Sequence, residues 1–399
     1  MRILVVGAGP AGTRCAARVA ERVRGASVTL AGAEPTLPYD RVALSKLLAG
    51  EARAEDLITH RLAALRDLGI AYRPGIAIAA LDRAAGEAVT ARGDRLAYDR
   101  LVLALGSAAI RLPLPGAGLP GVVLYRDMAD VRAMLRAAQD RGRAVVIGGG
   151  LLGLEAAVGL AARGMRVTVV HAVDWPMERQ LDAMAGGLLA TRLGTRGIRF
   201  AMPASSMAVE GTERATGVRL SDGSVLPADL VVMAVGIRPQ AALAREAGLP
   251  VNRGILVDDA MRTADPAIYA VGECAEHRGR CVGLVAPALE QAEVAARAIA
   301  GEAAAWAPRA DAAALKVSGT AVWSAGDIAD SAAESIVLRD EAEERYRRLL
   351  LRDGRLVGAV LYGDTADAGF YLDLITTRRP VAGLRPLLAF GPAFAREAA

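Results

Sequence analysis

Two short stretches of the chain are apolar at every position, and each leads directly into a glycine-rich turn. The stretches are residues 3–6 and 144–147. Continuous apolar runs of this length are typical of strands that are buried on both faces of a parallel sheet. After each turn, apolar residues recur with helical spacing and a second short apolar stretch follows. The pattern predicts two strand–turn–helix–strand units, with helices at 13–24 and 154–163 and second strands at 27–30 and 166–170.

Both turns are complete G-x-G-x-x-G motifs, and each has a strand before it and a helix after it. The first glycine permits a tight turn, the second lets the backbone approach a pyrophosphate, and the third lets helix and strand pack closely. The helix N-terminus offers free N–H groups to the phosphates. Two such units predict two dinucleotide sites. The expected contacts are Gly7, Gly9, Pro10, Ala11 and Gly12 in the first loop and Gly148, Gly150, Leu151, Leu152 and Gly153 in the second.

The residues that follow each unit's second strand differ. Glu34 stands just past the first one, where a carboxylate can accept hydrogen bonds from the two hydroxyls of an adenosine ribose. The second unit has His171 at this place and no acid until Asp174. This departure leaves NAD and NADP both open. Arg179 could meet a 2′-phosphate, although a solvated surface arginine is the simpler interpretation.

The rest of the chain supplies further strands and a separate C-terminal part. Strands are expected at 71–72, 76–80, 101–105, 228–236 and 263–271, with a hairpin-like piece that ends at 98–100. A short helix is expected from residue 44 onward, a second near residues 55–68 and a third over residues 287–300. The C-terminal part alternates like antiparallel strands at 335–339, 346–352 and 356–362, with Asp353-Gly354 as a hairpin turn and helices at 370–376 and 384–390.

Composition and charge narrow the class of protein. Hydrophobic residues make up 53% and charged residues 23%, as in globular chains. The charge-free run 112–125 holds three prolines and three glycines, so no membrane span is expected. The net charge is only +4 with scattered basic residues, which argues against a nucleic-acid partner. The three cysteines form no C-x-x-C or metal-binding spacing, which suits a reducing cytoplasm.

A few charged residues are candidates for the chemistry. Only two of the 48 basic residues are lysines, Lys46 and Lys316. Lys46 and Arg41 follow Glu34, so Arg41 could contact a pyrophosphate and Lys46 would lie farther along the cofactor. Solvated surface charges are the alternative for both. Glu155 falls in the first turn of the predicted second helix, where it could complement the helix dipole or contact the nicotinamide.

The strand at 263–271 ends in Gly272-Glu273, and the carboxylate of Glu273 can accept a hydrogen bond from a ribityl hydroxyl. With the two glycine loops, this strand resembles the pyridine-nucleotide-disulfide-reductase-like flavoproteins. The chain is similar, more closely, to the FAD part of bacterial assimilatory nitrite reductase large subunits and to the electron-transfer subunit of assimilatory nitrate reductases. The matching stretches are 32–50, 144–157, 167–182, 229–239, 251–259, 268–279 and 315–327.

The resemblance implies an α/β fold with two Rossmann-like dinucleotide-binding domains, as in glutathione reductase, and a small α+β C-terminal domain. FAD would occupy the first glycine loop and NAD(P)H the second. The implied segments are 1–111 and 239–308 for the interrupted FAD domain, 112–238 for the NAD(P)H domain, and 309–399 for an interface domain. The C-terminal domain would make a homodimer or dock the acceptor.

The resemblance also implies individual roles. Glu34 matches the ribose acid, Arg41 and Ser45 match the pyrophosphate contacts, and Glu273 matches the ribityl partner. Lys46 and Glu155 match an ion pair beside flavin N5 in related ferredoxin-type reductases. Leu105 replaces the usual threonine, which weakens a side-chain contact there. The further expected cofactor contacts are Pro35, Ile78, Ala104, Leu105, Gly106, Arg111, His171, Arg179, Gly236, Gly272 and Val285.

Two departures from the wider family shape the expected activity. The stretch 40–46 lacks the redox cysteines of disulfide reductases, and Cys274 is expected to pack behind Glu273 rather than pair with Cys281. The chain also lacks the cysteine-rich iron–sulfur and sirohaem modules, so it is not expected to reduce nitrite by itself.

The sequence therefore predicts an FAD-dependent NAD(P)H oxidoreductase. Its electrons would go to an iron–sulfur, sirohaem or molybdenum partner of nitrate or nitrite assimilation. A rubredoxin or ferredoxin reductase, an NADH oxidase and a non-enzymatic flavoprotein scaffold are the alternatives.

Overall fold

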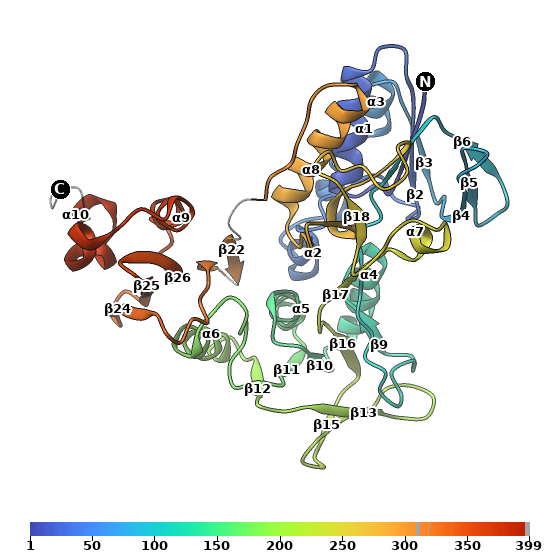
Figure 1. Cartoon of the computed structure of the whole chain (residues 1–399). Helices are drawn as coiled ribbons and strands as arrows, with labels where there is room; N and C mark the ends of the chain where they lie inside the picture. The colour runs from blue at the N-terminus through green and yellow to red at the C-terminus, as the bar shows by residue number, and fades with distance from the viewer. Residues whose placement is uncertain (309–311, 318, 396–399) are drawn as a thin grey trace. The chain divides into compact units, whose positions relative to one another are not determined.

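The computed structural model describes residues 1–308, 312–317 and 319–395 (Figure 1). The chain forms two compact units, which are described separately. Unit 1 contains residues 1–47, 51–109 and 237–308, and unit 2 contains residues 48–50, 110–236 and 309–399. The expected C-terminal segment 309–399 thus begins and ends on residues outside the described part of the chain.

Unit 1 is built on a five-stranded parallel sheet with the order β19-β7-β1-β2-β3. In this order the strands are Ile268–Ala270, Arg100–Leu103, Arg2–Val6, Ser27–Gly32 and Ile70–Pro74. Strand β1 is central, and Val5 lies in register with Leu30 on one side and Val102 on the other. The carboxyl ends of β1, β2, β7 and β19 therefore come together at one edge of the sheet, where ligands bind in open α/β folds.

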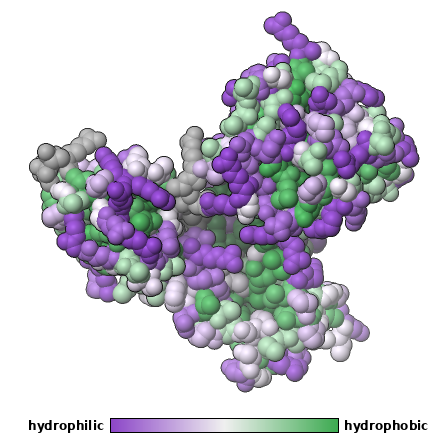
Figure 2. Space-filling model, in the orientation of Figure 1, coloured by the Kyte–Doolittle hydropathy of each residue, from purple (hydrophilic) through white to green (hydrophobic). Residues whose placement is uncertain are grey.

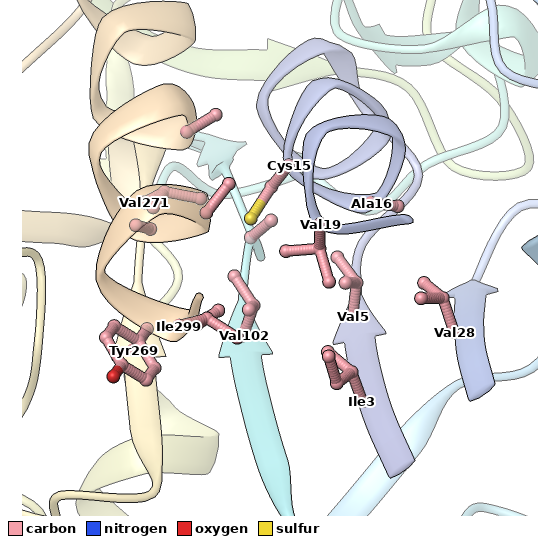
Figure 3. Close-up of a cluster of buried hydrophobic side chains, with 14 of the residues drawn as sticks. Ile3, Val5, Cys15, Ala16, Val19, Val28, Val102, Tyr269, Val271 and Ile299 are labelled. Carbon is pink, nitrogen blue, oxygen red and sulfur yellow. The ribbon is translucent and has the colours of Figure 1, made fainter. Parts of the chain in front are cut away.

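Both faces of this sheet are covered, which explains the continuous apolar run of β1. Ile3 and Val5 face one hydrophobic cluster, beneath the helices α1 (Pro10–Arg22) and α8 (Val285–Ile299), and Leu4 and Val6 face another. Figure 3 shows Cys15 and Val19 of α1 pointing toward the sheet. A strand buried in this way must be apolar at every position, because successive side chains alternate between the two faces.

Smaller elements complete unit 1. They are α2 (Leu44–Ala49, which reaches into residues 48–50 of unit 2), the 3₁₀ turns η1 (Ala54–Leu57) and η3 (Gly272–Cys274), α3 (Leu62–Asp67) and α7 (Ala242–Glu246). The strands β4 (Ile78–Asp82), β5 (Glu87–Thr90) and β6 (Arg95–Ala97) form one small sheet. Two further small sheets are present. One pairs β8 (Ser107–Ala109) with β17 (Ile237–Pro239), and the other contains β18 (Ile255–Val257), β20 (Ala275–His277) and β21 (Arg280–Cys281).

Unit 2 repeats the parallel architecture, with the strand order β12-β11-β10-β16-β9. In this order the strands are Arg199–Ala201, Arg166–Val170, Arg143–Ile147, Leu230–Met233 and Val122–Leu124. The helices of this part are α4 (Met128–Ala137), α5 (Leu151–Ala162) and α6 (Ala183–Gly194), and the 3₁₀ turn η2 (Ala138–Asp140) follows α4 directly. A small antiparallel sheet is formed by the strands β13 (Ser206–Glu210), β14 (Gly217–Leu220) and β15 (Val225–Pro227).

The C-terminal part of unit 2 is an antiparallel sheet with the order β22-β23-β26-β25-β24. In this order the strands are Ala312–Val317, Thr320–Gly326, Arg355–Gly363, Arg345–Arg352 and Glu334–Asp340. Asp353 and Gly354, with φ of 50° and 66°, make the tight turn between β25 and β26. Helix α9 (Ala368–Thr377), η4 (Ala382–Phe390) and α10 (Pro392–Ala395) follow.

The predicted fold class is confirmed, but one predicted helix is wrong and another differs in type. The expected helix near 55–68 is two short pieces, η1 and α3. The helix is broken because Ile58 pairs with Tyr39 in an antiparallel bridge and the Thr59 N–H donates to the carbonyl of Pro38. The expected helix at 384–390 is the 3₁₀ segment η4.

The hydropathy of the surface and the lengths of the helices can be compared with what a membrane span requires. Figure 2 shows hydrophilic residues over much of the visible surface, with hydrophobic residues in groups between them. Among the described helices, none combines the length and the apolar character that a membrane crossing requires.

Candidate dinucleotide-binding sites

The two glycine loops start with the same tight turn, in a backbone conformation that favours glycine. Gly7 and Gly148 have φ of 109° and 116°, a conformation that residues with a Cβ rarely adopt. A Cβ at Gly7 would lie 2.1 Å from the carbonyl oxygen of Ala104, and one at Gly148 would lie 2.3 Å from that of Ala234. Each loop therefore leaves its strand directly against the end of the neighbouring strand, and only glycine fits there.

The later glycines of the two loops also correspond. A Cβ on Gly12 or on Gly153 would lie 1.9 Å from the carbonyl oxygen of the first glycine of its own loop, so these positions allow the helix to cross the strand end closely. A Cβ on Gly9 or Gly150 would meet no atom of the described residues within 4 Å. The space before each helix N-terminus is therefore open, and the free N–H groups there suit a pyrophosphate.

Both helices begin three residues earlier than predicted, which changes the interpretation of Glu155. Helix α1 begins at Pro10 and α5 begins at Leu151, because the first helical turn lies inside the glycine motif itself. Glu155 is consequently in the second turn of α5, and the first turn holds no acidic residue. The dipole of the helix end weakens beyond its first turn, so it offers a poor explanation for Glu155.

At the end of β2, the predicted ribose acid and a predicted pyrophosphate contact are held together. Glu34 accepts a hydrogen bond of 2.7 Å from the hydroxyl of Tyr39 and forms an ion pair with Arg41. The guanidinium of Arg41 lies over the Tyr39 ring, 5.1 Å from its centroid. Tyr39 was not among the predicted contacts, although an aromatic residue between a predicted acid and a predicted arginine was an available signal.

An open cavity of about 790 Å³ lies in unit 1 beside this edge of the sheet. Three predicted cofactor residues, Gly7, Ile78 and Leu105, line it, as does Ala33, which directly precedes Glu34. Cofactor sites are typically concave and mostly apolar, with few polar groups. The cavity and the first glycine loop therefore share one edge of the sheet.

The Gly272-Glu273 motif joins the first site from a distant part of the sequence. Gly272 has φ of 78°, and a Cβ on it would lie 3.1 Å from the Cβ of Ala11 in the glycine loop. Glu273 accepts a hydrogen bond of 2.8 Å from the Ser107 hydroxyl. Gln291 of α8, which was not among the predicted contacts, accepts one of 2.8 Å from the Gly272 N–H, and its own buried amide nitrogen has no partner among the described residues. The Gln291 side chain therefore holds the Gly272 backbone in place.

Cys274 packs behind Glu273 as predicted. Its side chain is fully buried, and its thiol donates to the backbone carbonyl of Leu103 at 3.3 Å. Burial raises the pKa of the Cys274 thiol to about 11, so the reactive thiolate form is disfavoured at neutral pH.

In the second site, His171 supports the glycine loop. The Gly149 N–H donates to His171 Nδ1 at 3.1 Å, and His171 Nε2 lies 3.1 Å from Glu178 Oε2. The Met177 N–H donates to the Gly149 carbonyl at 3.0 Å. Residues 171–178 therefore close on the glycine loop. Arg179 is exposed and has no hydrogen-bond or ion-pair partner within the described part of the chain.

The two predicted catalytic residues lie on different elements. Burial raises the pKa of Glu155 on α5 to about 7, and the buried hydroxyl of Tyr125 in the same unit has no partner among the described residues. Lys46 is exposed on α2. Lys46 belongs to unit 1 and Glu155 to unit 2, so their pairing stays a prediction.

Other predicted contacts have local partners in the structure. The Ser45 hydroxyl donates to the Val42 carbonyl at 3.3 Å, and Arg111 donates to the Ala117 carbonyl at 2.6 Å. The Gly236 carbonyl accepts a hydrogen bond from the Ile110 N–H at 3.0 Å. These bonds fix the local backbone, and the expected cofactor roles of Ser45, Arg111 and Gly236 remain predictions.

Each of the two parallel sheets has a glycine loop at the carboxyl end of its central strand. We call these loops the first cradle (residues 7–12) and the second cradle (residues 148–153). Together they define a two-dinucleotide oxidoreductase fold. Residues 1–298 match the family described as pyridine nucleotide-disulphide oxidoreductase, and residues 312–379 match the rubredoxin NAD+ reductase C-terminal domain. The chain belongs to the pyridine nucleotide-disulphide oxidoreductase family. This confirms the family and the enzyme class predicted from the sequence; members of the family bind FAD and NAD(P)H.

Individual relatives agree with this assignment. The chain is 42% identical to a nitrite reductase [NAD(P)H] of Bacillus subtilis (strain 168), over 94% of this chain and 47% of that protein. It is 41% identical to the assimilatory nitrate reductase electron transfer subunit of the same organism, over 96% of this chain and 50% of that protein. The chain thus spans about half the length of these relatives. A ferredoxin reductase from Rhodopseudomonas palustris superposes with a TM-score of 0.90 at 29% identity, over 100% of this chain and 99% of the other.

Replacing Gly9 with alanine tests the first cradle. Because a Cβ there meets no protein atom and the φ of −75° is open to alanine, we expect the melting temperature of the FAD-free protein to stay unchanged. The added methyl group would enter the space of the pyrophosphate, so we expect FAD affinity to fall at least about tenfold. FAD binding is measured by fluorescence titration, with Gly187→Ala in α6 as the control, since it too meets no atom. Unchanged FAD affinity in Gly9→Ala would contradict the assignment.

Replacing Glu155 with glutamine tests its burial. A carboxyl group whose pKa is raised on folding binds its proton more tightly in the folded state. The wild type therefore loses stability relative to Glu155→Gln as the pH rises from about 4.5 to about 7. We expect equal unfolding free energies at pH 4 and an advantage of about 3 kcal/mol for the variant at pH 8. Urea unfolding of both proteins at both pH values measures the difference in their unfolding free energies. If this difference is the same at pH 4 and pH 8, Glu155 is not buried as described.

Proposed function

We propose that this chain is an FAD-dependent NAD(P)H oxidoreductase that passes electrons to a redox partner protein. The observation that carries the proposal is the presence of two glycine cradles with the same geometry, each on its own parallel sheet. A protein with one such cradle could hold a single dinucleotide. A protein with two can hold an electron donor and an acceptor together, so that positioning supplies much of the rate.

FAD belongs in the first cradle and the nicotinamide coenzyme in the second. Glu34 would accept the ribose hydroxyls of FAD, Arg41 and Ser45 would contact the pyrophosphate, and Glu273 would accept a ribityl hydroxyl. Bound FAD would supply a two-electron acceptor for the nicotinamide hydride and would release electrons singly. Support comes from the convergence of Gly272, Glu273 and Ala11 at one edge of unit 1.

Lys46 and Glu155 are the proposed catalytic residues. An ammonium near the flavin would stabilise the negative charge that develops on reduction, and a neighbouring carboxylate would hold it in place. We also propose the domain division 1–111 with 239–308 for FAD, 112–238 for NAD(P)H and 309–399 for docking or self-association.

The proposed acceptor is an iron–sulfur, sirohaem or molybdenum protein of nitrate or nitrite assimilation in the cytoplasm. The names of the Bacillus subtilis relatives support this choice. The second candidate is a ferredoxin or rubredoxin reductase. It is favoured by the superposition with the ferredoxin reductase and by the match of residues 312–379 to a rubredoxin reductase domain.

Anaerobic reduction tests the proposed function. We expect the FAD-loaded protein to be yellow and to bleach within seconds when one equivalent of NADH or NADPH is added. Candidate acceptors, namely a ferredoxin, a rubredoxin and a nitrite or nitrate reductase, are then added and reoxidation of the flavin is followed. If neither coenzyme bleaches the flavin, the proposed function is wrong, and the chain would be a non-catalytic flavoprotein scaffold.

Replacing Lys46 with methionine tests its proposed role. The apolar side chain keeps the length but removes the charge, so we expect flavin reduction in stopped flow to slow at least about tenfold while FAD stays bound. Arg53→Met is the control, because the Arg53 side chain is 80% exposed on a neighbouring segment and forms an ion pair with Asp56. An equal rate in Lys46→Met and wild type would remove Lys46 from the mechanism.

A further inference from the structure

The loop after β11 places the carboxylate of Glu178 against His171, the residue at the end of the second strand of the second dinucleotide unit. In dinucleotide-binding units an acidic residue at the end of the second strand accepts the ribose hydroxyls. This chain has His171 there, and His171 is 9% exposed and hydrogen-bonded on both ring nitrogens. His171 therefore contacts the glycine loop on one side and Glu178 on the other.

The hydrogen bonds of His171 determine which nitrogen carries its proton when the ring is neutral. The Gly149 N–H donates to Nδ1, so Nδ1 is the acceptor and Nε2 carries the hydrogen. Nε2–H then donates to Glu178 Oε2. A Cβ on Gly149 would lie 2.7 Å from the His171 ring, so the ring is held directly against the loop backbone. This contact fixes Glu178 relative to the phosphate-binding turn.

Glu178 keeps capacity for a ligand after this bond. A carboxylate has two oxygens, and only Oε2 is used by His171. The Glu178 side chain is 35% exposed, so part of it faces solvent. The neighbouring charged residues of the loop lack this anchor: Asp174 and Arg179 are both exposed and have no hydrogen-bond or ion-pair partner within the described part of the chain.

We propose that Glu178, positioned by His171, replaces the missing strand-end acid and selects NADH over NADPH. The inference rests on the proposed function, since it assigns the second cradle to the nicotinamide coenzyme. Glu178 accepts a hydrogen bond from the adenosine ribose of NADH. The same carboxylate repels the 2′-phosphate of NADPH, because two negative charges would meet at one place.

Binding of the oxidised coenzymes tests the proposal without turnover. NAD+ and NADP+ are titrated separately into the FAD-loaded protein, and the two dissociation constants are read from perturbation of the flavin spectrum. We expect the wild type to bind NAD+ more tightly. A hydrogen bond to a charged acceptor contributes enough that Glu178→Gln should weaken NAD+ binding by roughly tenfold or more. NADP+ binding should be unchanged or tighter, so the preference for NAD+ falls.

Two further variants make the comparison specific. Asp174→Asn removes the same charge from the same loop without touching His171, and we expect it to leave the preference unchanged. Glu178→Ala should shift the preference in the same direction as Glu178→Gln, and circular dichroism verifies that each variant is folded.

Other results separate the inference from the proposed function. A wild type that binds NADP+ more tightly, a Glu178→Gln preference within twofold of wild type, or an equal shift in Asp174→Asn would each overturn the role of Glu178. In all three cases the oxidoreductase function would stand, provided that a coenzyme bleaches the flavin. A wild type that binds neither coenzyme would overturn both.

Discussion

The structure depends on one close contact that occurs twice: a helix crosses the end of its strand so tightly that only glycine fits at the crossing. A Cβ on Gly12 or Gly153 would fall 1.9 Å from the carbonyl oxygen of the first glycine in its loop. This approach aims the N-terminus of α1 or α5 across the carboxyl edge of the sheet. The first N–H groups of each helix then have no partner in the helix and can bind phosphate oxygens.

The contact also determines which distant residues can take part in the first site. Because four strands of unit 1 end at the same edge, Glu34 after β2, Ser107 after β7 and Glu273 after β19 all follow strand ends at this edge. Each carboxylate already accepts a hydrogen bond from a protein hydroxyl, Tyr39 for Glu34 and Ser107 for Glu273. The polar groups are therefore oriented by the protein itself, which lowers the entropic cost of holding a ligand.

Features encoded in short stretches could be predicted, and those that need distant contacts could not. The buried strands and the glycine loops were predictable because β1 and β10 are apolar throughout and each loop has its own local pattern. The break at Ile58 was not, since it arises from pairing with Tyr39 across an intervening helix. Gln291 and the His171–Glu178 pair were missed because a single sequence does not show which polar side chains meet after folding.

A crystal structure of the protein with FAD and the oxidised coenzyme would show whether the two glycine loops hold the two dinucleotides. We predict the FAD pyrophosphate at Gly9–Gly12, within hydrogen-bonding distance of the first N–H groups of α1. We predict the coenzyme pyrophosphate at Gly150–Gly153 in the same relation to α5. A dinucleotide bound away from these loops, or FAD in the second cradle, would contradict this prediction.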